Sequence, residues 1–125
     1  MALRPVQVNI KARGTSAVGR FWAAALGRTV AAEGPATTSV APVGGMAWPH
    51  PVTVCVDIVT VPEARTPAKN RLHLDLATTS AAHRAELVER LRALGATPAD
   101  VGQGDVPWTV LADPEGHGFC VLALP

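Results

Sequence analysis

The two halves of the chain repeat one order of predicted elements. Residues 6–10 alternate apolar and polar side chains, which is typical of a half-buried strand. A helical pattern follows, and then come three short β-prone segments separated by Gly and Pro, at residues 27–34, 36–43 and 51–59. The second half repeats this order, with a strand at 71–76, a helix within 78–95 and strands near 97–101, 108–112 and 119–124. The repeat predicts two similar α+β modules, each with a helix on one face of its sheet.

Both predicted helices have one apolar stripe and a glycine at the C-terminal end. In the first helix, Thr15 or Ser16 can cap the N-terminus and Gly27 can end the last turn. In the second helix, Gly95 is placed to do the same. The residues expected to face the sheets are Val18, Phe21, Trp22, Ala25 and Leu26 in the first helix, and Leu87, Val88, Leu91 and Leu94 in the second.

Length and charge limit the class of protein. The 125 residues suit one domain, 1–125, with module 1 at about 5–61 and module 2 at about 70–125, joined by a short Pro-rich linker. With 11 basic and 10 acidic residues and no basic stripe, nucleic acid is not expected as a partner. The chain shows no signal segment or membrane span, so we expect a cytoplasmic protein whose two cysteines are thiols.

Polar residues alternate with the apolar residues of each module's first strand. If the apolar set faces the helix, Gln7 and Asn9 lie on the other face of one sheet, and His73 and Asp75 on the other face of the second. Two such faces brought together would make a partly polar cup. The same pattern is equally compatible with side chains that simply face solvent.

Three stretches, in this order, carry a resemblance to a known family: "VQVNIKARGTSAVGRFWAAALGR", "KNRLHLDL" and "WTVLADPEGHGFCVL". They resemble the glyoxalase-like, bleomycin-resistance-type domains of the vicinal oxygen chelate superfamily. The resemblance implies an α+β fold of two βαβββ modules that form a cup-shaped mixed sheet, commonly completed in a homodimer.

The resemblance also implies where metal-dependent relatives hold their ion. The His or Gln of the first strand falls on Gln7, the His of the second module on His73, and the Glu of the final strand on Cys120. Either Asp57 or Val59 falls on the fourth-strand position of module 1, and only Asp57 is a good ligand.

Cys120 is the departure that matters, because it removes the carboxylate that hard octahedral ions require. We therefore expect no metal cofactor. A divalent metal such as zinc, held by His73, Cys120, Gln7 and Asp57, is the alternative. For His73 the competing interpretation is a hydrogen-bonded residue of the cup, and its neighbour Asp75 is not expected to reach it.

The remaining candidates are aromatic and histidine residues. Trp22 belongs to the helix stripe, and Trp108 begins a strand and can face either the cup or the helix. Trp48 stands in a Gly/Pro-rich loop, as a rim residue or in local packing. His117 is expected in the turn that starts at Asp113, and His83 on the surface; these two histidines are not assigned to the site.

These observations predict a homodimeric protein that binds an apolar or aromatic small molecule without a metal. The resemblance implies a specific version, antibiotic resistance by sequestration of a bleomycin, mitomycin or enediyne. The alternative is a glyoxalase-like lyase, isomerase or dioxygenase that uses a metal or a general base. The expected ligand-binding residues are Gln7, Asn9, Trp48, Asp57, His73, Asp75, Trp108 and Cys120.

Overall fold

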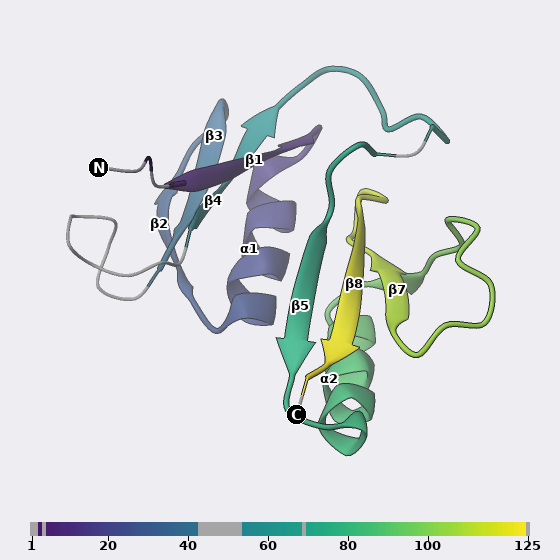
Figure 1. Cartoon of the computed structure of the whole chain (residues 1–125). Helices are drawn as coiled ribbons and strands as arrows, with labels where there is room; N and C mark the ends of the chain where they lie inside the picture. Colours follow the sequence, from purple (N-terminus) through teal and green to yellow (C-terminus); the bar gives the residue numbers. More distant parts are fainter. Residues whose placement is uncertain (1–2, 4, 43–53, 69, 125) are drawn as a thin grey trace. The chain divides into compact units, whose positions relative to one another are not determined.

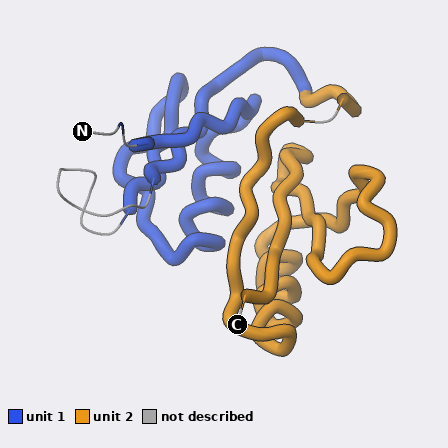
Figure 2. The backbone as a smooth tube through the Cα atoms, viewed as in Figure 1, with its two compact units in different colours: residues 1–64 blue, residues 65–125 orange. Residues whose placement is uncertain are grey.

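A computed structural model describes residues 3, 5–42, 54–68 and 70–124. It divides into two compact units, Met1–Ala64 and Arg65–Pro125 (Figure 2). Each unit has the order strand, helix and three strands, so the predicted α+β repeat of βαβββ modules is confirmed (Figure 1). Among the described residues, no helix is long and apolar enough to cross a membrane.

Unit 1 is a four-stranded mixed sheet with one helix. Its strands lie in the order β1-β4-β3-β2, with β1 parallel to β4 and the other neighbours antiparallel. The elements are β1 (Gln7–Ala12), α1 (Thr15–Leu26), β2 (Thr29–Glu33), β3 (Thr37–Ala41) and β4 (Cys55–Thr60).

The core of unit 1 is the helix-facing side of this sheet. Strand residues such as Ile10, Val40 and Ile58 are at most 2% exposed, as the alternating pattern of strands predicts. Trp22 is fully buried and meets Phe21 edge to face, with ring centroids 5.4 Å apart. The prediction that Trp22 belongs to the core is therefore confirmed.

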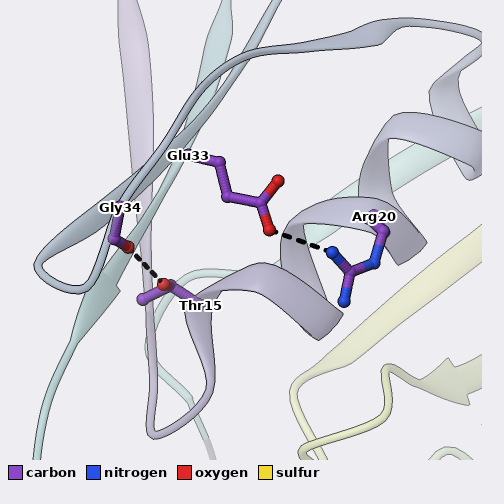
Figure 3. Close-up of polar contacts among 4 residues, drawn as sticks. All are labelled: Thr15, Arg20, Glu33 and Gly34. Atoms are coloured by element: carbon purple, nitrogen blue, oxygen red, sulfur yellow. Dashed lines mark hydrogen bonds and ion pairs between the residues drawn. The ribbon is translucent and has the colours of Figure 1, made fainter.

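The N-terminus of α1 differs from the expectation. The N-cap residue is Gly14, without a side-chain cap, and neither Thr15 nor Ser16 performs that role. The buried Thr15 hydroxyl instead donates a hydrogen bond of 3.0 Å to the carbonyl of Gly34, next to the end of β2 (Figure 3). The helix ends as predicted, at Gly27 with φ 65°.

A glycine lets α1 approach its sheet closely. A Cβ placed on Gly19 would lie 2.5 Å from Cγ2 of Thr38, a residue of β3 that is completely buried. Only a hydrogen atom fits there, so the packing of α1 on the sheet requires glycine at position 19.

Unit 2 has the same order of elements as unit 1, but the lengths of its strands differ. Its sheet has the order β5-β8-β7-β6, with β5 parallel to β8 and the other neighbours antiparallel. The elements are β5 (Leu74–Thr78), α2 (Ala81–Ala93), β6 (Thr97–Pro98), β7 (Thr109–Ala112) and β8 (Gly118–Ala123).

Several residues of unit 2 are more exposed than the sequence pattern predicts. Leu72 precedes β5 and is 86% exposed, and β5 starts at Leu74, three residues later than the expected strand at 71–76. On α2 only Leu91 is buried, and Leu94 is 37% exposed.

His83 is half-buried rather than a free surface residue. Its backbone N–H donates to the N-cap Ser80, and its Nδ1 accepts from the Thr79 N–H.

Candidate functional site

The β5, β7 and β8 strands place an ionisable cluster on one face of the unit 2 sheet. The strand register sets Asp75 and Val110 on either side of Cys120. Because adjacent paired residues share a face, the three side chains lie on the same side of the sheet. Asp75 is half exposed, so this is the face that α2 leaves uncovered, and we call it the open face of unit 2.

His73 joins this cluster from the segment just before β5. Its Nε2 lies 3.2 Å from Oδ1 of Asp75 and 3.7 Å from Sγ of Cys120. The expectation that Asp75 would not reach His73 is therefore wrong. The histidine lies directly before β5, two residues from Asp75, a spacing at which side chains of an extended chain lie on the same side.

The Cys120 thiol is protonated at neutral pH. Its pKa is raised above 9.0, first by burial and then by the charge of the Asp75 carboxylate, to which the thiol donates a hydrogen bond. Cys120 is 6% exposed, whereas the side chains of His73 and Asp75 are about half exposed. Asp75 and Cys120 both contact the same imidazole nitrogen of His73, Nε2. In a catalytic triad the carboxylate and the nucleophile contact different imidazole nitrogens, so these three residues are not arranged as a triad. The thiol is not an activated nucleophile.

The donor atoms of His73, Asp75 and Cys120 lie within 4.8 Å of one another, close enough to share one ion. Imidazole, carboxylate and thiolate are ordinary zinc ligands, and three of them plus water complete a tetrahedron. Hard octahedral ions fit poorly, since a sulfur replaces an oxygen ligand. Within unit 2, Asp75 joins His73 and Cys120 in this cluster, whereas Gln7 and Asp57 belong to unit 1.

A pocket of about 220 Å³ adjoins this cluster within unit 2. The lining includes apolar Val101 and Val110 and polar His73 and Cys120. Phe119 also touches the pocket, but it neighbours Cys120 on β8, so its side chain, which is 1% exposed, faces the α2 side of the sheet. The rest of the lining comes from Gly118 and from two residues of the linker segment, Arg65 and Asn70. A concave surface with an apolar wall and a few polar groups is the usual form of a small-molecule site.

In unit 1, three of the predicted site residues share the sheet face away from α1. The β1–β4 register pairs Gln7 with Cys55 and Asn9 with Asp57. Gln7 Nε2 donates to Asn9 Oδ1 at 3.1 Å, and the Cys55 thiol donates to Asp57 Oδ1 at 3.2 Å. Burial and the Asp57 carboxylate raise the pKa of Cys55 to about 11. Gln7, Asn9 and Asp57 are thus brought together, with Cys55 as an additional partner.

Comparison with known protein families decides the classification. The model of the glyoxalase-like domain matches residues 7–122, nearly the whole chain. The chain belongs to the glyoxalase-like domain family. Among curated proteins, none matches the chain.

Solved structures agree with this classification. A glyoxalase/bleomycin resistance protein/dioxygenase family enzyme from Burkholderia phytofirmans has a TM-score of 0.70 at 18% identity, over 95% of this chain and 97% of that one. A glyoxalase-related enzyme from Fulvimarina pelagi has a TM-score of 0.70 at 17% identity, over 99% and 90%. A glyoxalase/bleomycin resistance protein from Albidiferax ferrireducens has a TM-score of 0.63 at 18% identity, over 96% and 98%. At these identities the likeness shows the fold.

The turn between β7 and β8 of this glyoxalase-like domain is the one that the sequence predicts. The Gly116 N–H donates to the carbonyl of Asp113, and the buried Asp113 carboxylate accepts from the N–H groups of Glu115 and His117. His117 lies in the turn, and burial lowers its pKa. A Cβ on Gly116 would lie 3.4 Å from Cδ of Arg65, so the stem of that arginine packs on the turn.

Two predicted aromatic site residues have different outcomes. Trp108 is 40% exposed and directly precedes β7, two residues from the pocket residue Val110, and it does not line the pocket. Trp48 lies outside the described residues. The pocket residues that the sequence did not predict as site residues are Arg65, Asn70, Val101, Val110, Gly118 and Phe119. Of these, Val110 had a signal, the alternation that sets it beside Cys120. Arg65, Asn70 and Val101 lie in irregular segments.

Proposed function

We propose that this glyoxalase-like domain binds a small molecule with an apolar or aromatic part in the unit 2 pocket, without a metal ion. The observation that carries the proposal is the state of Cys120. At the position where the resemblance places a metal-binding glutamate, the chain has a buried, protonated thiol at the edge of an apolar-walled pocket. Sulfur is a poor ligand for the hard cations that a glutamate oxygen binds.

The volume of the pocket limits the size of the molecule that it can enclose. Its volume of about 220 Å³ is below the roughly 300–1,000 Å³ of sites that enclose drug-sized molecules. The unit 2 pocket by itself suits a compact metabolite, or one group of a larger antibiotic. Sequestration of bleomycins, mitomycins or enediynes stays a prediction that requires further surface. The homodimer also stays a prediction, which sedimentation analysis of the purified protein checks.

The test combines binding with metal analysis. A panel of small aromatic metabolites is screened by equilibrium dialysis against the full chain, with native mass spectrometry for any co-purified compound. Val101→Phe, which narrows the pocket, is expected to abolish the binding, and Val6→Phe, at an exposed valine outside the pocket, to preserve it. Equal binding by both variants refutes the pocket as the site. Stoichiometric metal in the purified protein refutes the metal-free part.

A zinc-dependent enzyme is the second candidate, favoured by the distances within the cluster of His73, Asp75 and Cys120. Zinc bound there would polarise an oxygen atom of a ligand in the adjacent pocket. This candidate predicts tight zinc binding that is lost in both His73→Ala and Asp75→Asn. Unchanged thermal unfolding of the wild-type protein on addition of zinc excludes it.

A further inference from the structure

We infer that the ligand of the unit 2 pocket carries an anionic group, a carboxylate in the simplest case, which Arg65 and Asn70 bind while its apolar part lies on Val101 and Val110. The inference rests on the proposed function and adds the chemical class of the ligand. It starts from the charges around the pocket. Among the described residues that line the pocket, Arg65 is the one lysine or arginine.

Asp75 and Asp113 each have other partners. Asp75 is engaged by His73 and by the Cys120 thiol, and Asp113 accepts two backbone N–H groups of its own turn. Neither lines the pocket. Of the residues that the structure describes, no acid forms an ion pair with Arg65.

The Arg65 guanidinium is held in place and still has donors available. Its Nη1 donates to the carbonyl of Thr66 at 2.7 Å and its Nη2 to that of Ala68 at 3.3 Å, while its stem packs on the turn at Gly116. A guanidinium has five N–H donors, so these two bonds position it without using them all. Such a preorganised fork matches the geometry of a carboxylate.

Asn70 supplies the second, independent observation. It lines the same pocket, and its Nδ2 is buried without a hydrogen-bond partner among the described residues. A buried amide donor that stays unpaired is destabilising, so its presence beside an arginine indicates an acceptor that arrives with the ligand. The linker segment thus supplies two residues with N–H donors, Arg65 and Asn70, to the lining of the pocket.

The experiment compares 3-phenylpropanoate with its neutral analogue, 3-phenylpropanamide, by titration of the ¹⁵N-labelled full chain at low salt. The amide signals of Val101, Val110 and Gly118 report binding in the pocket. The carboxylate is expected to bind about tenfold more tightly, the factor that charge-assisted hydrogen bonds supply. Arg65→Gln is expected to remove this preference. Arg71→Gln, which removes the charge of an exposed arginine of the same segment outside the pocket, is expected to keep it.

Asn70→Leu separates a binding role from a structural one. It is expected to reduce the preference for the carboxylate and to raise the midpoint of thermal unfolding, because it removes the unpaired buried donor. A lower midpoint with unchanged preference assigns Asn70 to structure and overturns its role in binding. Equal affinity of the two probes overturns the anionic class and leaves the proposed function intact. If neither probe shifts the pocket signals, the proposed function fails as well.

Discussion

The Cys120 thiol lies 3.7 Å from Nε2 of His73 on the open face of unit 2. In metal-dependent relatives, the resemblance places a carboxylate and an imidazole at these two positions. In this chain, burial and Asp75 raise the pKa of the Cys120 thiol, so the cysteine carries no charge at neutral pH. One of these two positions thus differs from the pattern of the metal-dependent relatives, and this difference can be reversed by mutation.

Cys120→Glu is expected to create a site for a hard divalent ion. The new carboxylate would stand beside His73 and Asp75, which supplies oxygen ligands and the charge that the thiol lacks. At an ion concentration 100 times the dissociation constant, stabilisation of about 2.7 kcal/mol follows from mass action. Thermal unfolding with and without Mn²⁺ or Ni²⁺ measures it. Cys120→Gln has the same size without the charge, and an equal response from both variants would contradict the prediction.

The raised pKa values of the Cys55 and Cys120 thiols predict that the protein loses stability at alkaline pH. Burial and Asp57 raise the pKa of Cys55 from 9.0 to about 11, so the folded state holds this proton more tightly than the unfolded state. This contribution is fully present below pH 9 and is lost as the pH rises towards 11. The chain has no tyrosine, which removes a group that would titrate in the same range.

Urea unfolding between pH 8 and 11 checks this prediction. In Cys55→Ala the fall in the free energy of unfolding with pH should be shallower than in the wild type, whatever the offset from the lost side chain. Asp57→Asn should narrow the pH window over which stability falls, because it removes the negative charge that helps to raise the pKa of Cys55. Parallel pH profiles for the wild type and Cys55→Ala would assign the alkaline loss to other groups.

The sequence predicts the parts of the structure that follow a regular period. Alternation placed Gln7, Asn9 and Asp75 on the correct sheet faces, since successive residues of a strand must point to opposite sides. The helix ending at Gly27 was also predictable, because a left-handed residue after the last turn strongly favours glycine.

Residues in irregular segments could not be placed in this way. His73 precedes its strand, so alternation indicates its side of the sheet but does not set its distances to Asp75 and Cys120. Arg65 and Asn70 lie in the linker segment, and only the fold of unit 2 brings them to the pocket. The role of Thr15 was predicted wrongly because its acceptor, Gly34, is distant in sequence.

Two contacts that join α1 to the region around β2 predict different effects on stability. Thr15→Val leaves the carbonyl of Gly34 without its hydroxyl donor in a part-buried position and should cost about 1 kcal/mol. Glu33→Gln breaks the 2.9 Å ion pair with Arg20, whose partners are 42% and 64% exposed, and should cost at most a few tenths. Urea unfolding of both variants measures the difference, and a larger effect for Glu33→Gln would contradict this ranking.

For Gly19→Ala, we expect the steric effect on the free energy of unfolding to oppose the effect of helix propensity. Alanine is favoured over glycine inside a helix by up to about 1 kcal/mol, so Gly19→Ala would stabilise α1 if space allowed. The added Cβ would instead lie 2.5 Å from Cγ2 of Thr38, and overpacking of this kind costs about 1–3 kcal/mol. We therefore expect a net loss in the free energy of unfolding, measured in urea.

A double-mutant cycle with Thr38→Ser identifies the cause. Serine lacks the Cγ2 methyl that the new Cβ would meet, although the remaining Cβ of residue 38 is still 3.2 Å away. Gly19→Ala should thus be clearly less destabilising in the Thr38→Ser background than in the wild type, since residues in contact couple and distant ones add. Identical losses in the two backgrounds would show that the close approach of α1 to β3 at this methyl does not limit residue 19.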